Sequence, residues 1–183
     1  MLKHILFLIF LICTFPSLCY AQSSFEVYLD RCQELRPDIE EILREEGLPE
    51  YFFYLALAES GCDPDNKSSK NALGLFQLVP HTFEHYSKGV CSKQTSCPIE
   101  YAYDPLVSTR VAARYIKSLY LRFNKNLDWT VAAYNAGGTN LMKKTSYYHG
   151  MDIEVVRKVY PQAYHLAMKV KKFSYMDKKL ENS

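Results

Sequence analysis

Glu59 is the residue whose neighbours in the sequence most clearly indicate a catalytic role. It lies in the stretch YFFYLALAES, whose first eight residues are all apolar or aromatic. On a helix, Phe52, Leu55 and Ala56 would share the face of this carboxyl group. Burial disfavours a charged carboxylate, and so does the negative end of a helix that stops at Gly61. Both effects raise the pKa of Glu59 and favour the protonated form that a general acid needs near neutral pH.

A second pattern has the spacing of a metal site. The sequence HTFEH places His81 and His85 four residues apart, with Glu84 between them. Two such histidines could bind zinc from one helix face, with the glutamate as base, as in inverted zinc peptidases. A five-residue pattern is weak, and no third ligand accompanies it. We therefore favour an exposed helix with two ordinary histidines, and we expect no metal and no organic cofactor.

The elements that must position these groups are predicted to be helices. In RPDIEEILREEG, the apolar residues Ile39, Ile42 and Leu43 have helical spacing, and a glycine ends the segment. The next helix has Pro49 in its first turn and a C-terminal glycine cap. A polar loop follows, and then helices are predicted in PHTFEHY, DPLVSTRVAARYIKSLYLRF, DWTVAAYNAGG with Asp128 as its cap, MDIEVVRKVY and PQAYHLAMKVKKF. No alternating segment is long enough to make a sheet, so the fold class is all-α with at most a short hairpin.

The chain opens with the pattern of an export signal. Lys3 precedes an apolar run of 11 residues, which is too short for a bilayer span of about 20 residues. Residues 1–21 are therefore predicted to be a signal peptide cleaved after Ala21, which places the protein in the periplasm or cell envelope, with secretion as an alternative. Cys19 could instead carry a lipid anchor, but Leu18 is bulky where lipoprotein processing requires a small residue.

The charge balance argues against a polyanionic partner. The chain has 22 basic and 20 acidic residues, and removal of the signal peptide takes away only Lys3, which leaves a net charge near +1. Proteins that bind nucleic acid normally carry a clear positive excess. Nucleic acid is therefore not an expected partner.

Cysteine usage indicates disulfide bonds. Of six cysteines, four remain after removal of the signal peptide: Cys32, Cys62, Cys91 and Cys97. An even number in an exported chain suggests disulfides, with three possible pairings. Cys91 and Cys97 could close one small loop, which would leave Cys32 with Cys62. Buried free thiols are the alternative.

The segment ESGCDPDNKSSKNALGLFQ, which begins at Glu59, resembles the catalytic segment of lytic transglycosylases with a lysozyme-like fold. The family pattern is E-S, an apolar residue, a proline, a serine and G-L-x-Q. It is matched without a gap at Glu59, Ser60, Pro64, Ser68, Ala72, Gly74, Leu75 and Gln77. The preceding EEGLPEYFFYLALAES resembles especially the membrane-bound type D enzymes. LVPHT, DPLVSTRVAARYI and AAYNAGG then follow in family order, so the likeness covers residues 37–170.

The resemblance implies a single lysozyme-like domain that cuts the β-1,4 bond between N-acetylmuramic acid and N-acetylglucosamine in peptidoglycan glycan strands without consuming water. Glu59 would protonate the leaving oxygen and then act as base towards the C6 hydroxyl of muramic acid, which leaves a 1,6-anhydro end. That internal hydroxyl replaces the second carboxylate of ordinary glycosidases. Ser60, Gln77, Tyr134 and Asn135 match family positions that hold the catalytic region and the sugar.

Together with the export signal and the polar C-terminus, the resemblance divides the chain into a signal peptide at 1–21, an N-terminal segment at 22–36, a catalytic domain at 37–173 and a polar tail at 174–183. The tail is expected to be frayed from Lys178 onward. Cys62 stands where the family usually has an aromatic or aliphatic residue, which fits a disulfide. Asn71 replaces a frequent glycine and tolerates positive φ.

Other interpretations of the same residues stay open. Glu59 could be a half-exposed glutamate or the partner of an arginine. Hydrolysis, as in goose-type lysozymes, would need a second carboxylate such as Asp63, Asp65 or Glu84 to position water. A non-catalytic wall-binding or secretion-assembly component could share the fold, and an active enzyme could also serve such a cell-envelope machine.

Overall fold

A computed structural model describes residues 24–93, 95–146 and 150–182 of the chain. This part is all-α, as predicted, and its only strand-like features are two isolated bridges within residues 67–78. The elements are α2 (Ser24–Cys32), α3 (Arg36–Glu45), the 3-10 turn η1 (Glu50–Phe52), α4 (Phe53–Ser60), α5 (Pro80–Tyr86), the 3-10 turn η2 (Ile99–Tyr103), α6 (Pro105–Arg122), α7 (Leu127–Ala136), α8 (Gly138–Thr145), α9 (Ile153–Val159) and α10 (Pro161–Glu181). The predicted signal peptide and Cys19 lie outside the described residues.

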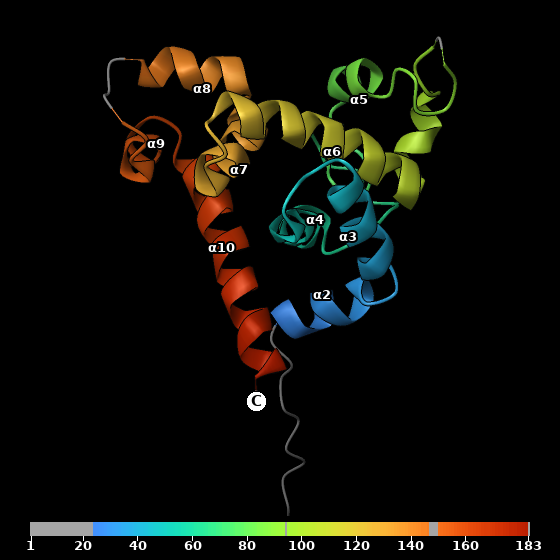
Figure 1. Cartoon of the computed structure of the whole chain (residues 1–183), viewed down its shortest axis with the longest axis horizontal. Helices are drawn as coiled ribbons and strands as arrows, with labels where there is room; N and C mark the ends of the chain where they lie inside the picture. Colours follow the sequence, from blue (N-terminus) through green and yellow to red (C-terminus); the bar gives the residue numbers. More distant parts are fainter. Residues whose placement is uncertain (1–23, 94, 147–149, 183) are drawn as a thin grey trace, which may run out of the picture.

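The short helix α4 forms the centre of the core. Six of its eight residues are buried, and it packs against α2, α3 and α10. Figure 1 shows α4 enclosed by these helices, with α10 along one side and α2 below. Burial of each large apolar side chain contributes about 1.5–3 kcal/mol. The apolar stretch predicted to be a core helix is therefore the element around which the others assemble.

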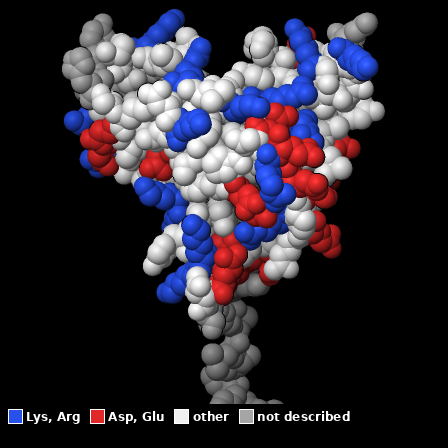
Figure 2. Space-filling view, viewed as in Figure 1, with Lys and Arg blue, Asp and Glu red and all other residues white. Residues whose placement is uncertain are grey.

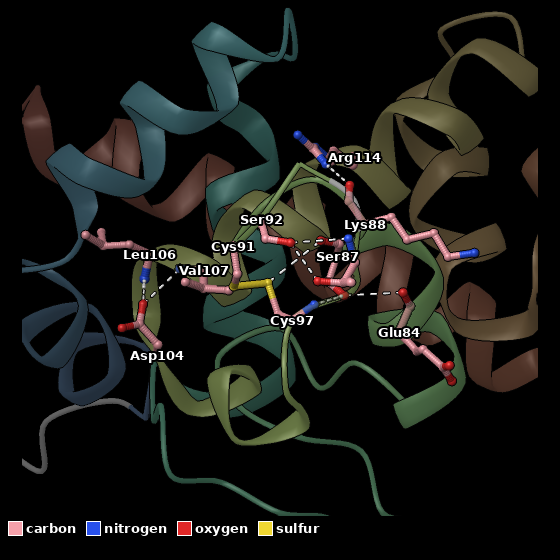
Figure 3. Close-up of a disulfide and its surroundings, with 11 residues drawn as sticks. Glu84, Ser87, Lys88, Cys91, Ser92, Cys97, Asp104, Leu106, Val107 and Arg114 are labelled. Atoms are coloured by element: carbon pink, nitrogen blue, oxygen red, sulfur yellow. Dashed lines mark hydrogen bonds between the residues drawn. A yellow bond between two sulfur atoms is a disulfide. The ribbon is translucent and has the colours of Figure 1, made fainter.

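The long helix α6 begins where the sequence predicts. Asp104 caps it, because one carboxylate oxygen accepts hydrogen bonds from the N–H groups of Leu106 at 3.0 Å and Val107 at 2.9 Å. Figure 3 shows this cap beside the loop closed by the disulfide between Cys91 and Cys97. α6 packs against α3, α5 and α7, so it connects the α3 side of the domain to the α7 side.

Both predicted disulfide pairs are present in the structure. Cys32 is bonded to Cys62, which joins the end of α2 to the residues after α4, and Cys91 is bonded to Cys97. Around the second pair, the hydroxyl of Ser87 accepts the N–H of Cys97 at 3.0 Å (Figure 3). The first disulfide therefore braces the segment that contains the predicted acid.

The prediction of a polar tail at 174–183 that frays from Lys178 onward is wrong, because helix α10 continues to Glu181. Asp177 is only 3% exposed. It accepts hydrogen bonds from Arg36 Nη1 at 2.7 Å and from the hydroxyl of Tyr54 at 2.5 Å. A buried carboxylate with two donors ties the end of α10 to α3 and α4, which orders residues that look solvated in the sequence.

One further local prediction needs correction. The cap of α7 is Asn126, whose side chain accepts the N–H of Trp129 at 3.0 Å, whereas Asp128 lies in the first turn and pairs with Lys171 of α10 at 3.0 Å. The glycine pair ends α7 as predicted, with Gly137 as its C-cap, but the sequence did not predict the helix that follows directly. Gly138 already begins α8.

Basic and acidic side chains are interspersed on the face seen in Figure 2, as the small net charge suggests. Basic side chains of α6 pair with acidic residues at and just after the end of α3, including Arg110 with Glu45 and Arg114 with Glu46. No helix in the described ranges combines the length and the apolar character needed to cross a bilayer.

Candidate active site

Glu59 lies in the last turn of α4, at the point where the helix leaves the core. The helix ends at Gly61, which has a φ of +65° and donates its N–H to the carbonyl of Leu57 at 3.1 Å. A Cβ at this glycine would come within 2.8 Å of the ring of Tyr28. Glycine is therefore required both by the left-handed cap and by the close packing of α2, and the cap fixes where the carboxyl group of Glu59 emerges.

The loop that follows, residues 66–79, folds back beside Glu59. Leu73 and Leu78 exchange two backbone hydrogen bonds of 3.0 Å, and the N–H of Gly74 donates to the carbonyl of Asn66 at 2.9 Å. Gly74 has a φ of +69°, and a Cβ there would lie 2.0 Å from the carbonyl oxygen of Ala102. The sequence motif G-L-x-Q thus corresponds to a tight turn that only glycine fits.

Ser60 and Gln77 hold this loop in place. The hydroxyl of Ser60 donates to the carbonyl of Leu75 at 2.7 Å, and the Nε2 of Gln77 donates to the carbonyls of Asn66 at 3.1 Å and Gly74 at 3.0 Å. Because these groups are engaged with backbone, both side chains are placed to position the loop. Gln77 also lines the pocket beside Glu59, whereas Ser60 is absent from its lining.

A pocket of about 450 Å³ opens over Glu59. Its walls come from α4, the 66–79 loop, α5, α6, α7 and α10, and they include the predicted residues Gln77, Tyr134 and Asn135. Lining residues that were not predicted from the sequence include Lys70, Thr82, Tyr115 and Gln162. A neighbouring cavity of about 310 Å³ shares Tyr115 and Gly137 with this pocket. The hollow therefore extends beyond Glu59, along α6 and towards the start of α8.

Glu59 is the only carboxylate among the described residues that line the pocket. Burial raises its pKa to about 7 from an ordinary value of 4.5, while the positive charge of Lys169 acts in the opposite direction. The direction matches the one predicted from the apolar helix. A carboxyl group with a pKa near 7 exchanges its proton readily at neutral pH, which suits a group that must donate a proton and then accept one.

Tyr134 faces Glu59 from α7. It is buried, its hydroxyl donates to the carbonyl of Phe76 at 2.7 Å, and its ring lies 5.1 Å from that of Tyr115. Burial raises the pKa of Tyr134 well above its usual value, and the nearby Glu59 adds to this. Tyr134 therefore stays neutral and fixes the 66–79 loop against α7. Asn135, the next residue, is exposed and lines the pocket.

The residues of the rival interpretations lie elsewhere. Asp63, Asp65 and Glu84 are not among the residues that line the pocket. Asp63 instead accepts the N–H of Asp65 at 3.1 Å within its own turn. His81 and His85 are exposed on α5. Across the described ranges, no group of three histidine, cysteine or acidic side chains could hold a metal ion.

Comparison with known proteins identifies the class. Residues 38–156, more than half of the chain, match the Transglycosylase SLT domain family, and the chain belongs to that family. The matched range runs from within α3 to within α9, and it includes Glu59, the 66–79 loop and the Tyr134–Asn135 pair. The resemblance noted in the sequence is thereby confirmed at the level of the family.

Two curated relatives are similar over part of the chain. Membrane-bound lytic murein transglycosylase D of Escherichia coli strain K12 is 32% identical over 101 residues, which is 55% of this chain and 21% of that protein. Soluble lytic murein transglycosylase of the same strain is 33% identical over 87 residues, 48% of this chain and 13% of the relative. The chain thus matches about a fifth or less of the length of these relatives.

Solved structures share the fold. An inactive mutant of the lytic transglycosylase Slt from Pseudomonas aeruginosa superposes with a TM-score of 0.72 over 91% of this chain and 27% of that chain, at 21% identity. A complex of the 70-kDa soluble lytic transglycosylase with bulgecin A gives a TM-score of 0.69 over 86% of this chain and 26% of the other, at 20% identity. The lysozyme-like all-α fold predicted from the sequence is confirmed.

Proposed function

We propose that this protein is a peptidoglycan lytic transglycosylase. It cleaves the β-1,4 bond between N-acetylmuramic acid and N-acetylglucosamine and leaves 1,6-anhydromuramic acid ends, with Glu59 as general acid and then general base. The family membership supports the class of reaction. The observation that carries the assignment of Glu59 is its position as the one carboxylate lining the described pocket, with a pKa raised to about 7.

The chemistry needs only this one acid. Protonated Glu59 gives its proton to the glycosidic oxygen as the bond from that oxygen to C1 of muramic acid breaks, so N-acetylglucosamine leaves as an alcohol. The resulting carboxylate then takes the proton of the C6 hydroxyl, whose oxygen forms the new bond to C1. The proton on Glu59 is restored and no water is consumed. Since the nucleophile is part of the substrate, no second carboxylate is required to place it.

The other pocket residues support this assignment by their chemistry. Amide and hydroxyl groups of Gln77, Thr82, Asn135 and Gln162 face a space large enough for sugar rings, and such groups bind sugar hydroxyls by hydrogen bonds. The ring of Tyr115 offers an apolar face of the kind that packs on sugars. We infer that these residues orient the glycan strand, and that Tyr134 and Ser60 hold the surrounding backbone.

We further propose that the protein acts in the cell envelope. The predicted export signal, the two disulfides and a cell-wall substrate all point to a compartment outside the cytoplasm. Service to a cell-envelope assembly machine is compatible with this activity.

The test uses purified sacculi incubated with the protein and with its Glu59→Gln variant. The wild type should release muropeptides that are lighter by one water than reducing muropeptides, as measured by mass spectrometry, and Glu59→Gln should release none. Glu84→Gln is the matched control, since it removes an exposed carboxylate outside the pocket, and it should remain active. Reducing ends in the products would instead establish hydrolysis. Full activity of Glu59→Gln would reject Glu59 as the acid.

A further inference from the structure

Lys169 connects α10 to the last turn of α4. Its Nζ donates a hydrogen bond of 2.6 Å to the carbonyl of Ala58, the residue directly before Glu59. The carbonyls at the end of a helix lack partners within the helix. A side chain from a different helix, 111 residues later in the sequence, supplies this one. The hydrogen bond restrains the backbone from which the Glu59 side chain projects.

The ammonium group of Lys169 also lies at the negatively charged end of α4. The C-terminal end of α4 carries the negative end of the helix dipole, and the Glu59 carboxylate adds a full charge when it is ionised. The positive charge of Lys169 lowers the pKa of Glu59, opposing burial, and the two groups perturb each other. The Nζ further lies 5.5 Å from the ring centre of Phe173 on the same helix, which limits its range of positions.

The titratable groups around Glu59 leave Lys169 as the cation that acts on it. Tyr134, from α7, is the other group coupled to Glu59, and it stays neutral. Lys70 of the 66–79 loop and Tyr115 of α6 line the same pocket, but neither is a cause of the shifted pKa of Glu59.

We propose that Lys169 is a positioning residue of the active site, which fixes the last turn of α4 through Ala58 and stabilises Glu59 while it is ionised between its two proton transfers. This inference rests on the proposed function of Glu59. In the first transfer Glu59 must hold a proton, and in the second it must be an anion long enough to take one. Burial alone favours only the first state, and the nearby ammonium group offsets it.

The test compares Lys169→Met with Lys172→Met. Lys172 is an exposed lysine on the same helix. Its variant removes the same charge but leaves the hydrogen bond between Lys169 and Ala58 of α4 in place. The midpoint of Glu59 ionisation is followed in each variant by NMR of ¹³C-labelled glutamate carboxyl groups, with the Glu59 signal assigned as the one missing in Glu59→Gln. This readout requires no activity.

We expect the ionisation midpoint of Glu59 to rise by roughly half a pH unit in Lys169→Met and to stay unchanged in Lys172→Met. The fall of kcat/KM at high pH should move upward by the same amount, and kcat should drop several-fold with little change in KM. Lys169→Arg should restore the wild-type midpoint. If Lys169→Met does not fold, Lys169→Gln keeps a donor for the Ala58 carbonyl and should show the same displacement of the midpoint.

The two proposals fail in different ways. Activity of Glu59→Gln on sacculi would overturn the proposed function whatever the titration shows. An inactive Glu59→Gln combined with equal midpoints in the lysine variants would leave that function standing and overturn the inference about Lys169. A loss of activity in Lys169→Met without any displacement of the midpoint would also overturn it, because that result describes a purely structural contact.

Discussion

The substitution Glu59→Gln should make the protein more stable at alkaline pH. Glutamine resembles the protonated form of glutamate in shape and stays neutral at every pH. In the wild type, the pKa of Glu59 is about 7 in the folded state against an ordinary value of 4.5. The folded state therefore binds this proton more tightly than the unfolded chain does. The stabilisation by the buried neutral acid is complete below pH 4.5 and is lost as the pH rises from 4.5 through 7.

The magnitude follows from the two pKa values. Each pH unit between them corresponds to 1.36 kcal/mol, so ionisation of Glu59 costs the folded state at most about 3 kcal/mol at pH 8. Glu59→Gln avoids this cost. Relative to the wild type, its free energy of unfolding should be higher by up to about 3 kcal/mol at pH 8 and nearly equal at pH 4. For a chain of this size the gain corresponds to roughly 6–12 °C in Tm.

The assay is urea denaturation of the wild type and Glu59→Gln at several pH values from 4 to 8, followed by circular dichroism. Glu84→Gln serves as the control, because Glu84 is exposed on α5, and its difference from the wild type should stay flat over this range. A difference between Glu59→Gln and wild type that does not grow with pH would refute the reasoning, since it would mean that Glu59 is not held in an environment that disfavours its charge.

Three further substitutions test other parts of the structure. Tyr134→Phe leaves the carbonyl of Phe76 without its donor and should cost about 1–3 kcal/mol of stability together with a loss of muropeptide release; unchanged stability would contradict the role given to the hydroxyl. Asp177→Asn weakens the buried contacts between α10 and the helices α3 and α4 and should destabilise by about 2–4 kcal/mol in urea, with a wild-type urea midpoint as the opposing result. Replacement of Cys32 and Cys62 by serine opens a link across 30 residues and should lower stability by about 3–4 kcal/mol in the same assay; no loss would show that the disulfide constrains little.

Local signals in the sequence were sufficient to predict the helix that carries Glu59 and the start of α6. The stop at Gly61, the cap at Asp104 and the apolar run before Glu59 act within one or two helical turns, and each is found where it was predicted. The direction of the pKa shift of Glu59 could be predicted for the same reason, because its main cause is the apolar helix to which it belongs.

Long-range contacts could not be predicted in this way. Asp177 and Lys169 look like ordinary surface charges in the sequence, but their partners Arg36 and Ala58 lie more than a hundred residues away. The cap of α7 shows the same limit at short range. Both Asn126 and Asp128 are good caps, and the choice is decided by the pairing of Asp128 with α10.

The pocket was predictable only in part. Gln77, Tyr134 and Asn135 were found through motifs, and the structure brings all three to the pocket over Glu59. Ser60 belongs to the support of the loop. Tyr115 was missed because it is one of several aromatic residues in an ordinary amphipathic helix, and its position over the pocket depends on how α6 crosses α7.

In the proposed reaction, one carboxyl group and an internal hydroxyl break the glycosidic bond without water. The most direct measurement is digestion of sacculi in water enriched in ¹⁸O, followed by mass spectrometry of the released muropeptides. We expect anhydro products that carry no heavy oxygen and that disappear in Glu59→Gln. Reducing muropeptides with one heavy oxygen at C1 would rule out this reaction, because they would show that water is the nucleophile.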